Sequence, residues 1–279
     1  EPAALCSGGI DSTIVTAMAA EIVRNMGLAK PLKVFTLGSL VPLTNDEAYA
    51  RYAANKLGLG LTVVRPEITN LGMRLHDCLM LQDEPLAMPS FYPLAQLVSK
   101  VSEHSRILLT GDGGDEVFLG YGDKSMWLAQ DAGNHEGHVR VGSPVPHWMS
   151  EWGARMTTDH LVGHGFAKID RASAEQGVEI RCPLVDSDLM AYAKSLPPEF
   201  LMHGGVMKAL LKQCLANWPH WFLNRRKLGF VINLRWQWGL SGFSGLREMV
   251  QDEAIEQFAS CLPIQLRKPA AAWRSADVF

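Results

Sequence analysis

Short apolar segments alternate with helix-like segments over the first 120 residues, and this alternation constrains the fold more than any other feature. Strand-like runs are expected at 2–6, 34–37, 61–65 and 106–110. Between the first two runs, Ile14, Met18 and Ile22 recur every four residues, which is helical spacing. Strands that alternate with helices of this length are typical of a parallel sheet covered by helices on both faces.

The second half of the chain has a different pattern. Beyond about residue 121, Gly and Pro interrupt the sequence, and the later segments have mostly helical periodicity. We therefore expect an α/β region over 1–125, followed by a mainly helical region over 126–279 that completes the structure. Besides the first helix, helices are expected at 44–57, 67–82, 93–104, 187–196, 206–216 and 246–260.

Composition excludes some classes of partner. The chain has 279 residues, of which 47% are apolar and 20% charged, and its net charge of -3 gives no electrostatic reason to bind nucleic acid or a membrane surface. No apolar run reaches the roughly 18 residues of a membrane-spanning helix. The five cysteines include no C-x-x-C pair, which favours reduced thiols and a cytoplasmic location.

The first chemical motif is Ser-Gly-Gly-Ile-Asp-Ser-Thr at 7–13, between the first strand and its helix. Two glycines let backbone N–H groups approach phosphate oxygens closely, and the helix N-terminus adds a partial positive charge. Asp11 would repel a bare phosphate, which indicates a bridging Mg²⁺. The plain alternative is a Gly-Gly turn that only begins a helix.

The second motif is Thr-Gly-Asp-Gly-Gly-Asp-Glu at 110–116, directly after the apolar strand at 106–110. Parallel α/β sheets bind ligands outside the carboxyl ends of their strands. The two motifs should therefore face one crevice, where Asp11 and Asp115 share a metal ion. A surface turn made of Gly and Asp would explain the glycines but not the correspondence with the first motif.

Several common signatures are missing, and a more specific resemblance is present. The chain contains no G-x-x-x-x-G-K-[ST], no G-x-G-x-x-G and no G-x-S-x-G. S-G-G-x-D-S after an apolar strand resembles the pyrophosphate loop of ATP enzymes that release AMP and pyrophosphate. Taken in order, the segments 7–13, 83–85, 109–121, 177–186 and 226–230 resemble the synthetase domain of glutamine-dependent asparagine synthetases. Peptide-cyclising and β-lactam-forming synthetases are similar in the same places.

The resemblance implies a fold like that of the adenine nucleotide alpha hydrolases and a role for individual residues. It implies that Asp11 and Asp115 bind Mg²⁺. Asp112 would be the acid/base residue that helps the incoming nitrogen lose its proton, and Lys227 would stabilise charge on the reacting acyl-adenylate. The residues implied in ATP binding are Leu5, Ser7, Gly8, Gly9, Asp11, Ser12, Leu37 and Gly111.

Some charged residues have two interpretations. Lys227 lies in the basic run 225–227, which would otherwise be a solvated surface segment. Lys208 is placed either near the phosphates or on an exposed helix face. Substrate contact and a structural ion-pair network are both open for Glu179, Arg181 and Asp186.

The resemblance implies an ATP-dependent amide ligase that forms an acyl-adenylate, with aspartate as the carboxylate substrate. The chain lacks the N-terminal glutaminase domain of these enzymes, so a missing domain, a separate partner or free ammonia would supply nitrogen. Asp112 stands where the family usually has glutamate, one methylene longer, which leaves the nitrogen nucleophile open. The alternatives are cyclisation of a peptide, amidation of a sugar acid on a surface polysaccharide, and a non-catalytic scaffold.

Overall fold

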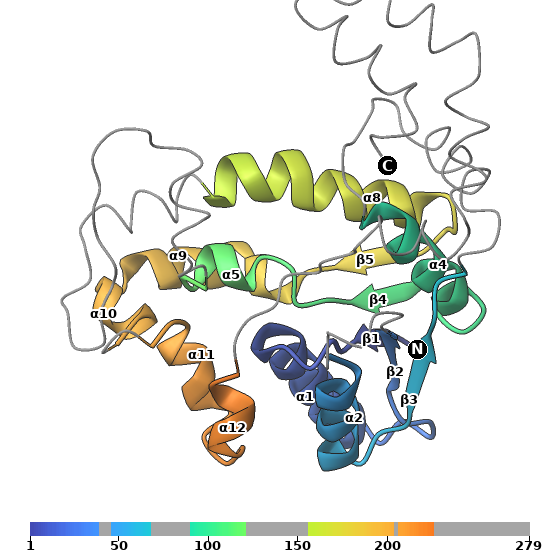
Figure 1. The fold of residues 1–279 in the computed structure, drawn as a ribbon, viewed down its shortest axis with the longest axis horizontal. Helices are drawn as coiled ribbons and strands as arrows, with labels where there is room; N and C mark the ends of the chain where they lie inside the picture. The colour runs from blue at the N-terminus through green and yellow to red at the C-terminus, as the bar shows by residue number, and fades with distance from the viewer. Residues whose placement is uncertain (39–45, 68–89, 121–155, 204–205, 226–279) are drawn as a thin grey trace, which may run out of the picture.

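Five parallel strands form one sheet at the centre of the protein (Figure 1). The computed structural model describes residues 1–38, 46–67, 90–120, 156–203 and 206–225. The strand order is β3-β2-β1-β4-β5, and every neighbouring pair is parallel. The strands are β1 (Ala3–Leu5), β2 (Lys33–Leu37), β3 (Leu61–Val64), β4 (Ile107–Leu109) and β5 (Glu179–Arg181).

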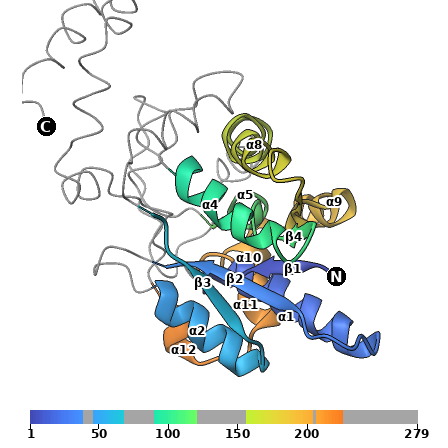
Figure 2. The ribbon, with the colours of Figure 1, turned by 90° about the vertical axis from the view of Figure 1, so that its right-hand side faces the viewer.

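Helices cover both faces of the sheet, as the sequence predicts (Figures 1 and 2). Ala3 and Phe35 pack with α4 and α8 on one face, whereas Ala4 and Val34 pack with α1 and α2 on the other. This division follows from the alternation of side chains along a strand. The longer helices are α1 (Ile10–Asn25), α2 (Asp46–Leu57), α4 (Phe91–Ser102), α8 (Ala167–Ala174) and α9 (Ser187–Ser195).

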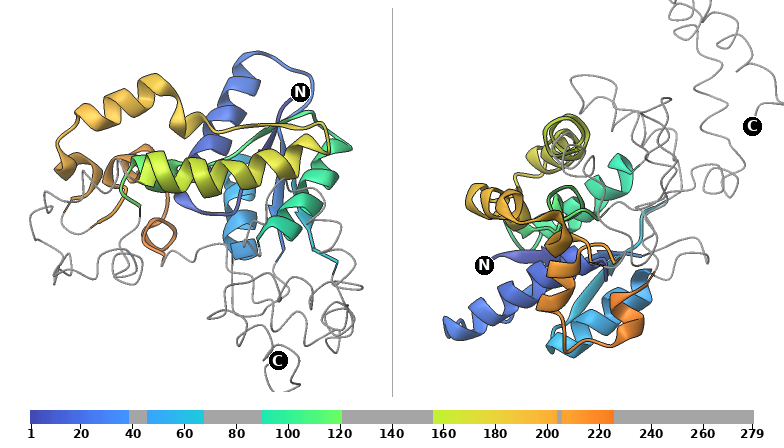
Figure 3. Two further views of the ribbon diagram at one scale, coloured as in Figure 1. Left: turned by 90° about the horizontal axis from the view of Figure 1, so that it is seen from above. Right: turned by 90° about the vertical axis from the view of Figure 1, so that its left-hand side faces the viewer.

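The remaining helices extend the fold beyond one end of the sheet. A π-helix, η1 (Met156–Phe166), continues directly into α8 and forms one long rod beside the sheet (Figure 3). A separate hydrophobic cluster joins α1 to the short helices of this part. These are α5 (Gly114–Val117), the 3-10 helix η2 (Pro183–Val185), α10 (Pro198–Leu201), α11 (Ala209–Cys214) and α12 (His220–Leu223).

The strand β5 is absent from the sequence-based expectation, which assigned the second half of the chain mainly to helices. Its Glu179 and Arg181 are exposed, and only Ile180 packs against the core. A three-residue edge strand with two charged side chains has no apolar run to reveal it. The expected division near residue 125 and the helices at 67–82 and 246–260 fall on residues outside the described ranges and stay predictions.

The helix α1 is confirmed, but only part of its apolar pattern faces the core. Of the three residues spaced four apart, Ile14 is buried, whereas Met18 and Ile22 are 60% and 55% exposed. Their apolar neighbours Val15, Ala19 and Val23 are buried instead. None of the described helices is long and apolar enough to cross a membrane.

The order of the strands places a topological switch point between β1 and β4. From β1 the chain proceeds outward to β2 and β3, whereas β4 lies on the other side of β1 and leads to β5. Open α/β sheets bind ligands in the crevice outside the carboxyl ends of the strands at such a point. The segments 7–13 and 110–116 follow β1 and β4, so both begin at this crevice.

Candidate functional site

The glycine-rich segments 7–13, after β1, and 110–116, after β4, lie in direct contact. We call them the first and the second corner. A Cβ atom added to Gly111 would collide with the backbone nitrogen of Ser12 and lie 2.7 Å from the carbonyl carbon of Asp11. A Cβ atom added to Gly114 would lie 2.5 Å from the carboxyl carbon of Asp11. Glycine is therefore required at both positions to let the second corner approach the start of α1. The expectation that the two corners lie together is confirmed.

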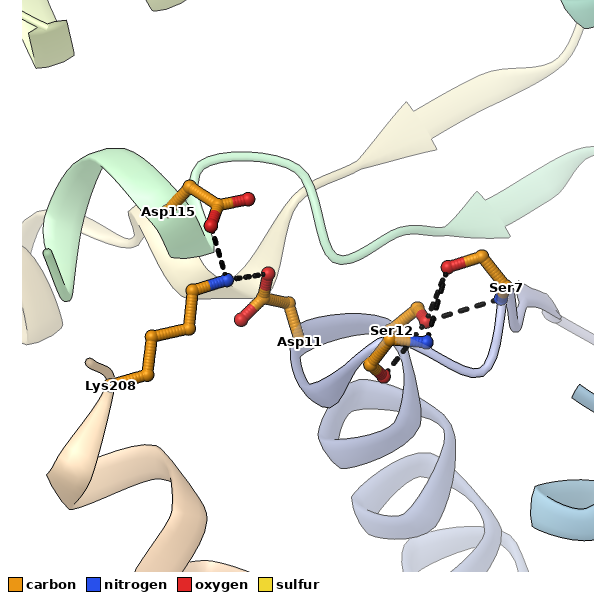
Figure 4. A network of polar contacts seen from close by, with 6 residues as sticks. Ser7, Asp11, Ser12, Asp115 and Lys208 are labelled. Atoms are coloured by element: carbon orange, nitrogen blue, oxygen red, sulfur yellow. Dashed lines mark hydrogen bonds and ion pairs between the residues drawn. The ribbon is translucent and has the colours of Figure 1, made fainter. Parts of the chain in front are cut away.

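The first corner is held by hydrogen bonds around the hydroxyl of Ser12. Its Oγ accepts a hydrogen bond from Ser7 N at 3.1 Å and lies 3.0 Å from Ser7 Oγ. It also lies 3.2 Å from the carbonyl oxygen of Gly9, to which it can donate. Figure 4 shows the two serines facing each other at the N-terminus of α1. This arrangement fixes the loop so that its backbone and hydroxyl donors are in place before a ligand binds.

A small space beside Gly9 is surrounded by hydrogen-bond donors. The position that a Cβ atom would take at Gly9 is 3.4 Å from Ser7 Oγ, 3.6 Å from Arg225 Nη2 and 3.9 Å from Ser12 Oγ. Two hydroxyls and one guanidinium thus surround the volume beside Gly9 that the Cβ atom of any other residue would fill. This volume lies at the start of the 16-residue helix α1, where the helix dipole favours an anion. We call it the anion cradle.

Gly8 has a structural role that distinguishes it from Gly9. Its φ of +73° is disfavoured for other residues, and an added Cβ atom would lie 2.5 Å from the Cβ of Tyr49. Gly8→Ala should lower the free energy of unfolding by about 1–2 kcal/mol through its conformation and by about 1–3 kcal/mol more through the collision. Gly58→Ala is the matched control, because Gly58 has a φ of +69° and open space around it. Denaturant unfolding of both variants measures the difference, and equal losses would contradict the close approach to Tyr49.

Each corner contributes one aspartate to the same cation, which is the ammonium group of Lys208. Lys208 Nζ donates to Asp11 Oδ2 and lies 2.5 Å from Asp115 Oδ1, as Figure 4 shows. The Lys208 side chain is only 8% exposed. Burial on its own would lower the pKa of Lys208, but the charges of Asp11 and then Asp115 outweigh burial and raise that pKa above its ordinary value. The ammonium group is therefore charged and bridges the two corners.

This position of Lys208 excludes the interpretation that it lies on an exposed helix face. The residue is buried rather than exposed on a helix face, and it precedes α11 instead of lying within it. Its φ of +54° is left-handed, a conformation that costs a non-glycine residue about 1–2 kcal/mol. A Cβ atom added to Gly120 would collide with both Asp115 and Lys208. The surrounding chain is thus shaped to place this ammonium between the two carboxylates.

The two carboxylates fit a magnesium site in their chemistry. Asp11 and Asp115 are close enough to bind one cation together, because both contact Lys208 Nζ. Mg²⁺ is commonly held by one or two carboxylates together with substrate phosphates. Within the described ranges, no group of three or more His, Cys, Asp or Glu side chains could hold a metal ion. The pair therefore suits a metal that arrives with a phosphate ligand.

The other predicted site residues surround the crevice. Leu5 and Leu37 end β1 and β2, and their side chains pack against the core on the α4 face, which leaves their backbone at the carboxyl edge of the sheet. Asp112 is half-buried in the second corner. Burial, and to a smaller extent the charge of Asp112, raises the pKa of Cys182 to about 11, although a hydrogen bond with Thr110 opposes the shift.

The remaining charged candidates divide into three cases. Glu179 and Arg181 form an exposed ion pair with a 2.8 Å separation. Asp186 caps α9 by accepting hydrogen bonds from the backbone of the first turn. Both observations favour the structural interpretation of these three residues. Lys227 lies outside the described residues, so its catalytic role stays a prediction.

Arg225 lies near the two corners, although the sequence motifs assign it no role. It belongs to the basic run 225–227, and its guanidinium forms one side of the anion cradle. Its place depends on contacts with α2, 179 positions away along the chain. No local sequence signal could have indicated such a contact.

Comparison with known proteins shows which family this sequence resembles. A sequence model of the asparagine synthase family matches residues 1–268. The glutamine-hydrolyzing asparagine synthetases of Gallus gallus and Homo sapiens are 24% and 25% identical over 293 residues, covering 99% of this chain and 48% of their own length. Asparagine synthetase 1 of Bacillus subtilis is 23% identical over 297 residues, covering 82% of this chain and 46% of its own. The chain spans about half the length of these curated relatives.

Proposed function

The chain belongs to the asparagine synthase family, and from this premise we propose that it is an ATP-dependent, AMP-forming amide ligase. In this proposal a substrate carboxylate attacks the α-phosphate of ATP, and the bond to the β-phosphate breaks. The products of this step are an acyl-adenylate and pyrophosphate. A nitrogen nucleophile then attacks the acyl carbon, forms the amide and releases AMP.

One observation carries the proposal: the loop proposed to bind phosphate and a pair of acidic residues meet at the switch point of the sheet. The anion cradle beside Gly9 offers donors to phosphate oxygens, and Asp11 and Asp115 converge on one cation. Neither a helix-starting turn nor a surface turn explains why both features lie in one crevice. A non-catalytic scaffold would have no need of them.

The first corner would bind the phosphates and the strand ends would bind the nucleoside. The backbone of the loop and the hydroxyls of Ser7 and Ser12 would donate hydrogen bonds to phosphate oxygens. Backbone groups at the ends of β1 and β2 would contact adenosine, and Gly111 would line the adenylate pocket. The residues proposed to contact ATP are Leu5, Ser7, Gly8, Gly9, Asp11, Ser12, Leu37 and Gly111.

Mg²⁺ is the proposed metal, held by Asp11 and Asp115. When bound, it would neutralise charge on the phosphates. Lys208 would have to release at least one of the two carboxylates for the metal to be held, because its ammonium already occupies the space between them.

The two proposed catalytic residues act on the second step. Asp112 would accept a proton from the attacking nitrogen, which contributes about 10²- to 10⁴-fold for a well-placed base. Lys227 would stabilise negative charge on the acyl-adenylate as a compact point charge. Orienting the two reactants would contribute on the order of 7–11 kcal/mol.

Aspartate is the proposed carboxylate substrate, and glutamine or ammonia the proposed nitrogen source. The support is the name of the relatives, which are glutamine-hydrolyzing asparagine synthetases. Glutamine would require a glutaminase domain, either joined to this chain or separate. A cytoplasmic location and a division of the chain near residue 125 are part of the same proposal.

A related ligase with a different acceptor is the second candidate. The observation that favours it is Asp112, whose carboxylate reaches one methylene less far than the glutamate usual in the family. A peptide or a sugar acid would then replace aspartate or ammonia. Mass analysis of the products formed with ATP, aspartate and ammonia separates the candidates: asparagine supports the first, and amide formed only when a peptide or sugar acid is added supports the second.

Exchange of labelled pyrophosphate into ATP tests the adenylation step. We expect exchange that requires both Mg²⁺ and aspartate, and a loss of about 10- to 100-fold in Asp11→Asn, because a charge-assisted contact is removed. Asp170→Asn changes an exposed aspartate of α8 and should retain full exchange. Thermal unfolding should verify that both variants are folded. Undiminished exchange in folded Asp11→Asn would contradict the proposed site.

A further inference from the structure

We propose that Arg225 binds the β- and γ-phosphates of ATP and then the pyrophosphate that leaves, while Asp46 and Tyr49 hold its guanidinium in place. The inference rests on the proposed function, since it concerns the same ATP site. In this inference Arg225 binds the pyrophosphate leaving group and not the adenylate. It also gives a role to the start of α2, which neither motif contains.

The position of the guanidinium is the first argument. Arg225 Nη2 lies 3.6 Å from the point where a Cβ atom on Gly9 would be. The nearest polar atoms to the same point are the hydroxyls of Ser7 and Ser12. A phosphate group that approaches Gly9 from this side would have two hydroxyls and one charged donor around it.

The restraint on the guanidinium is the second argument. Arg225 Nη1 donates to Asp46 Oδ1 at 2.6 Å, and the guanidinium carbon lies 4.5 Å from the centre of the Tyr49 ring. The side chain is 12% exposed. One edge of the planar group is thus fixed by a carboxylate and one face by an aromatic ring. The Nη2 edge is presented to the anion cradle at little further cost in side-chain entropy.

The supporting elements are themselves fixed. Arg225 follows α12, whose Phe222 is fully buried and whose ring lies 5.8 Å from that of Tyr49. Asp46 begins α2, where the helix dipole favours a carboxylate. The helix dipole would therefore stabilise the negative charge of Asp46 independently of Arg225, and Asp46 would hold Arg225 in place. The result is a preformed donor at the phosphate loop.

The charges near the corners favour binding of pyrophosphate, the leaving group, by Arg225 over binding of the phosphate of the adenylate. The other cation at the corners, Lys208, is already paired with Asp11 and Asp115. Among the described residues, Arg225 has one carboxylate partner, so its second edge can serve an anion. Pyrophosphate carries more negative charge than the single phosphate of AMP, and an arginine fork suits two of its oxygens at once.

Isothermal titration of the full chain with pyrophosphate and Mg²⁺, and separately with AMP, tests the inference. Arg225→Met keeps an unbranched apolar side chain and removes the guanidinium that lies over the Tyr49 ring. We expect its affinity for pyrophosphate to fall about 10- to 100-fold, and its affinity for AMP to change by less than about threefold. Arg225→Lys should recover only part of the loss, because lysine lacks the planar fork. Arg51→Met removes an exposed arginine of α2 and should leave both affinities unchanged.

Two further variants separate binding from folding. Gly9→Ala adds a methyl group at ordinary contact distances, so the melting temperature should hold while pyrophosphate affinity falls on the order of tenfold. Asp46→Asn keeps Arg225 but weakens its restraint, and should give a smaller loss than Arg225→Met.

The outcomes that overturn the inference differ from those that overturn the proposed function. Unchanged pyrophosphate affinity in Arg225→Met, with normal binding by the parent chain, would refute the role of Arg225 alone. Equal losses for AMP and pyrophosphate would show that Arg225 has only a structural role. A parent chain that binds neither ATP, AMP nor pyrophosphate would refute the ATP site itself.

Discussion

Asp112→Asn should separate the two half-reactions, leaving pyrophosphate exchange within a few-fold of normal while amide formation falls about 10²- to 10⁴-fold. Asparagine has nearly the shape of aspartate but cannot accept a proton. Asp112 is half-buried in the second corner, next to the adenylate pocket proposed at Gly111. Its loss should therefore affect the nitrogen nucleophile and not the attack of the carboxylate on ATP. Parallel assays of exchange and of amide product on one preparation measure the ratio.

The control for this experiment is Asp188→Asn, which changes an exposed aspartate in the first turn of α9. It should alter neither rate. If exchange and amide formation fell together in Asp112→Asn, the residue would act in binding ATP or the carboxylate, and its assignment as the base would be wrong.

Lys208→Met should produce the largest loss of stability of any single substitution considered. It removes the cation that Asp11 and Asp115 share and leaves two largely buried carboxylates side by side. Breaking a buried ion pair by removing one partner costs about 3–5 kcal/mol. Denaturant unfolding should show a loss of this size. Mg²⁺ should stabilise the variant more than the parent chain, because the carboxylates would no longer be occupied by the ammonium group.

Lys212→Met is the matched control for Lys208→Met. Lys212 lies one helical turn further along, is half-buried, and has a 3.4 Å contact with the side chain of Asn224. Its replacement should change stability by about 1 kcal/mol or less. Adding Asp11→Asn to Lys208→Met should recover part of the lost stability, since one unpaired charge is removed. A loss in Lys208→Met no larger than in Lys212→Met would contradict the bridging role of Lys208.

The parts of the site that follow directly from strands could be predicted from the sequence. The segments 7–13 and 110–116 each come immediately after an apolar run, and a parallel sheet brings the carboxyl ends of its strands to one edge. The meeting of the two corners thus depends on local signals and one general rule. The parallel sheet and its helices on both faces were predictable for the same reason.

The parts that depend on distant contacts could not be predicted. The helical spacing of Met18 and Ile22 indicated a helix correctly but not its buried face, because small residues such as Ala19 allow α1 to pack closely on the sheet. The pairing of Lys208 depends on Asp11, 197 positions earlier in the chain, and on Asp115. Arg225 reaches the anion cradle only because aromatic packing joins α12 to α2.

A crystal structure of the protein with Mg²⁺ and a non-hydrolysable ATP analogue tests most directly whether both corners bind one triphosphate. We predict phosphate density in the anion cradle beside Gly9, with a metal ion between the phosphates and the carboxylates of Asp11 and Asp115. Density for the analogue at any other place, or phosphates that contact only one of the two corners, would contradict the account.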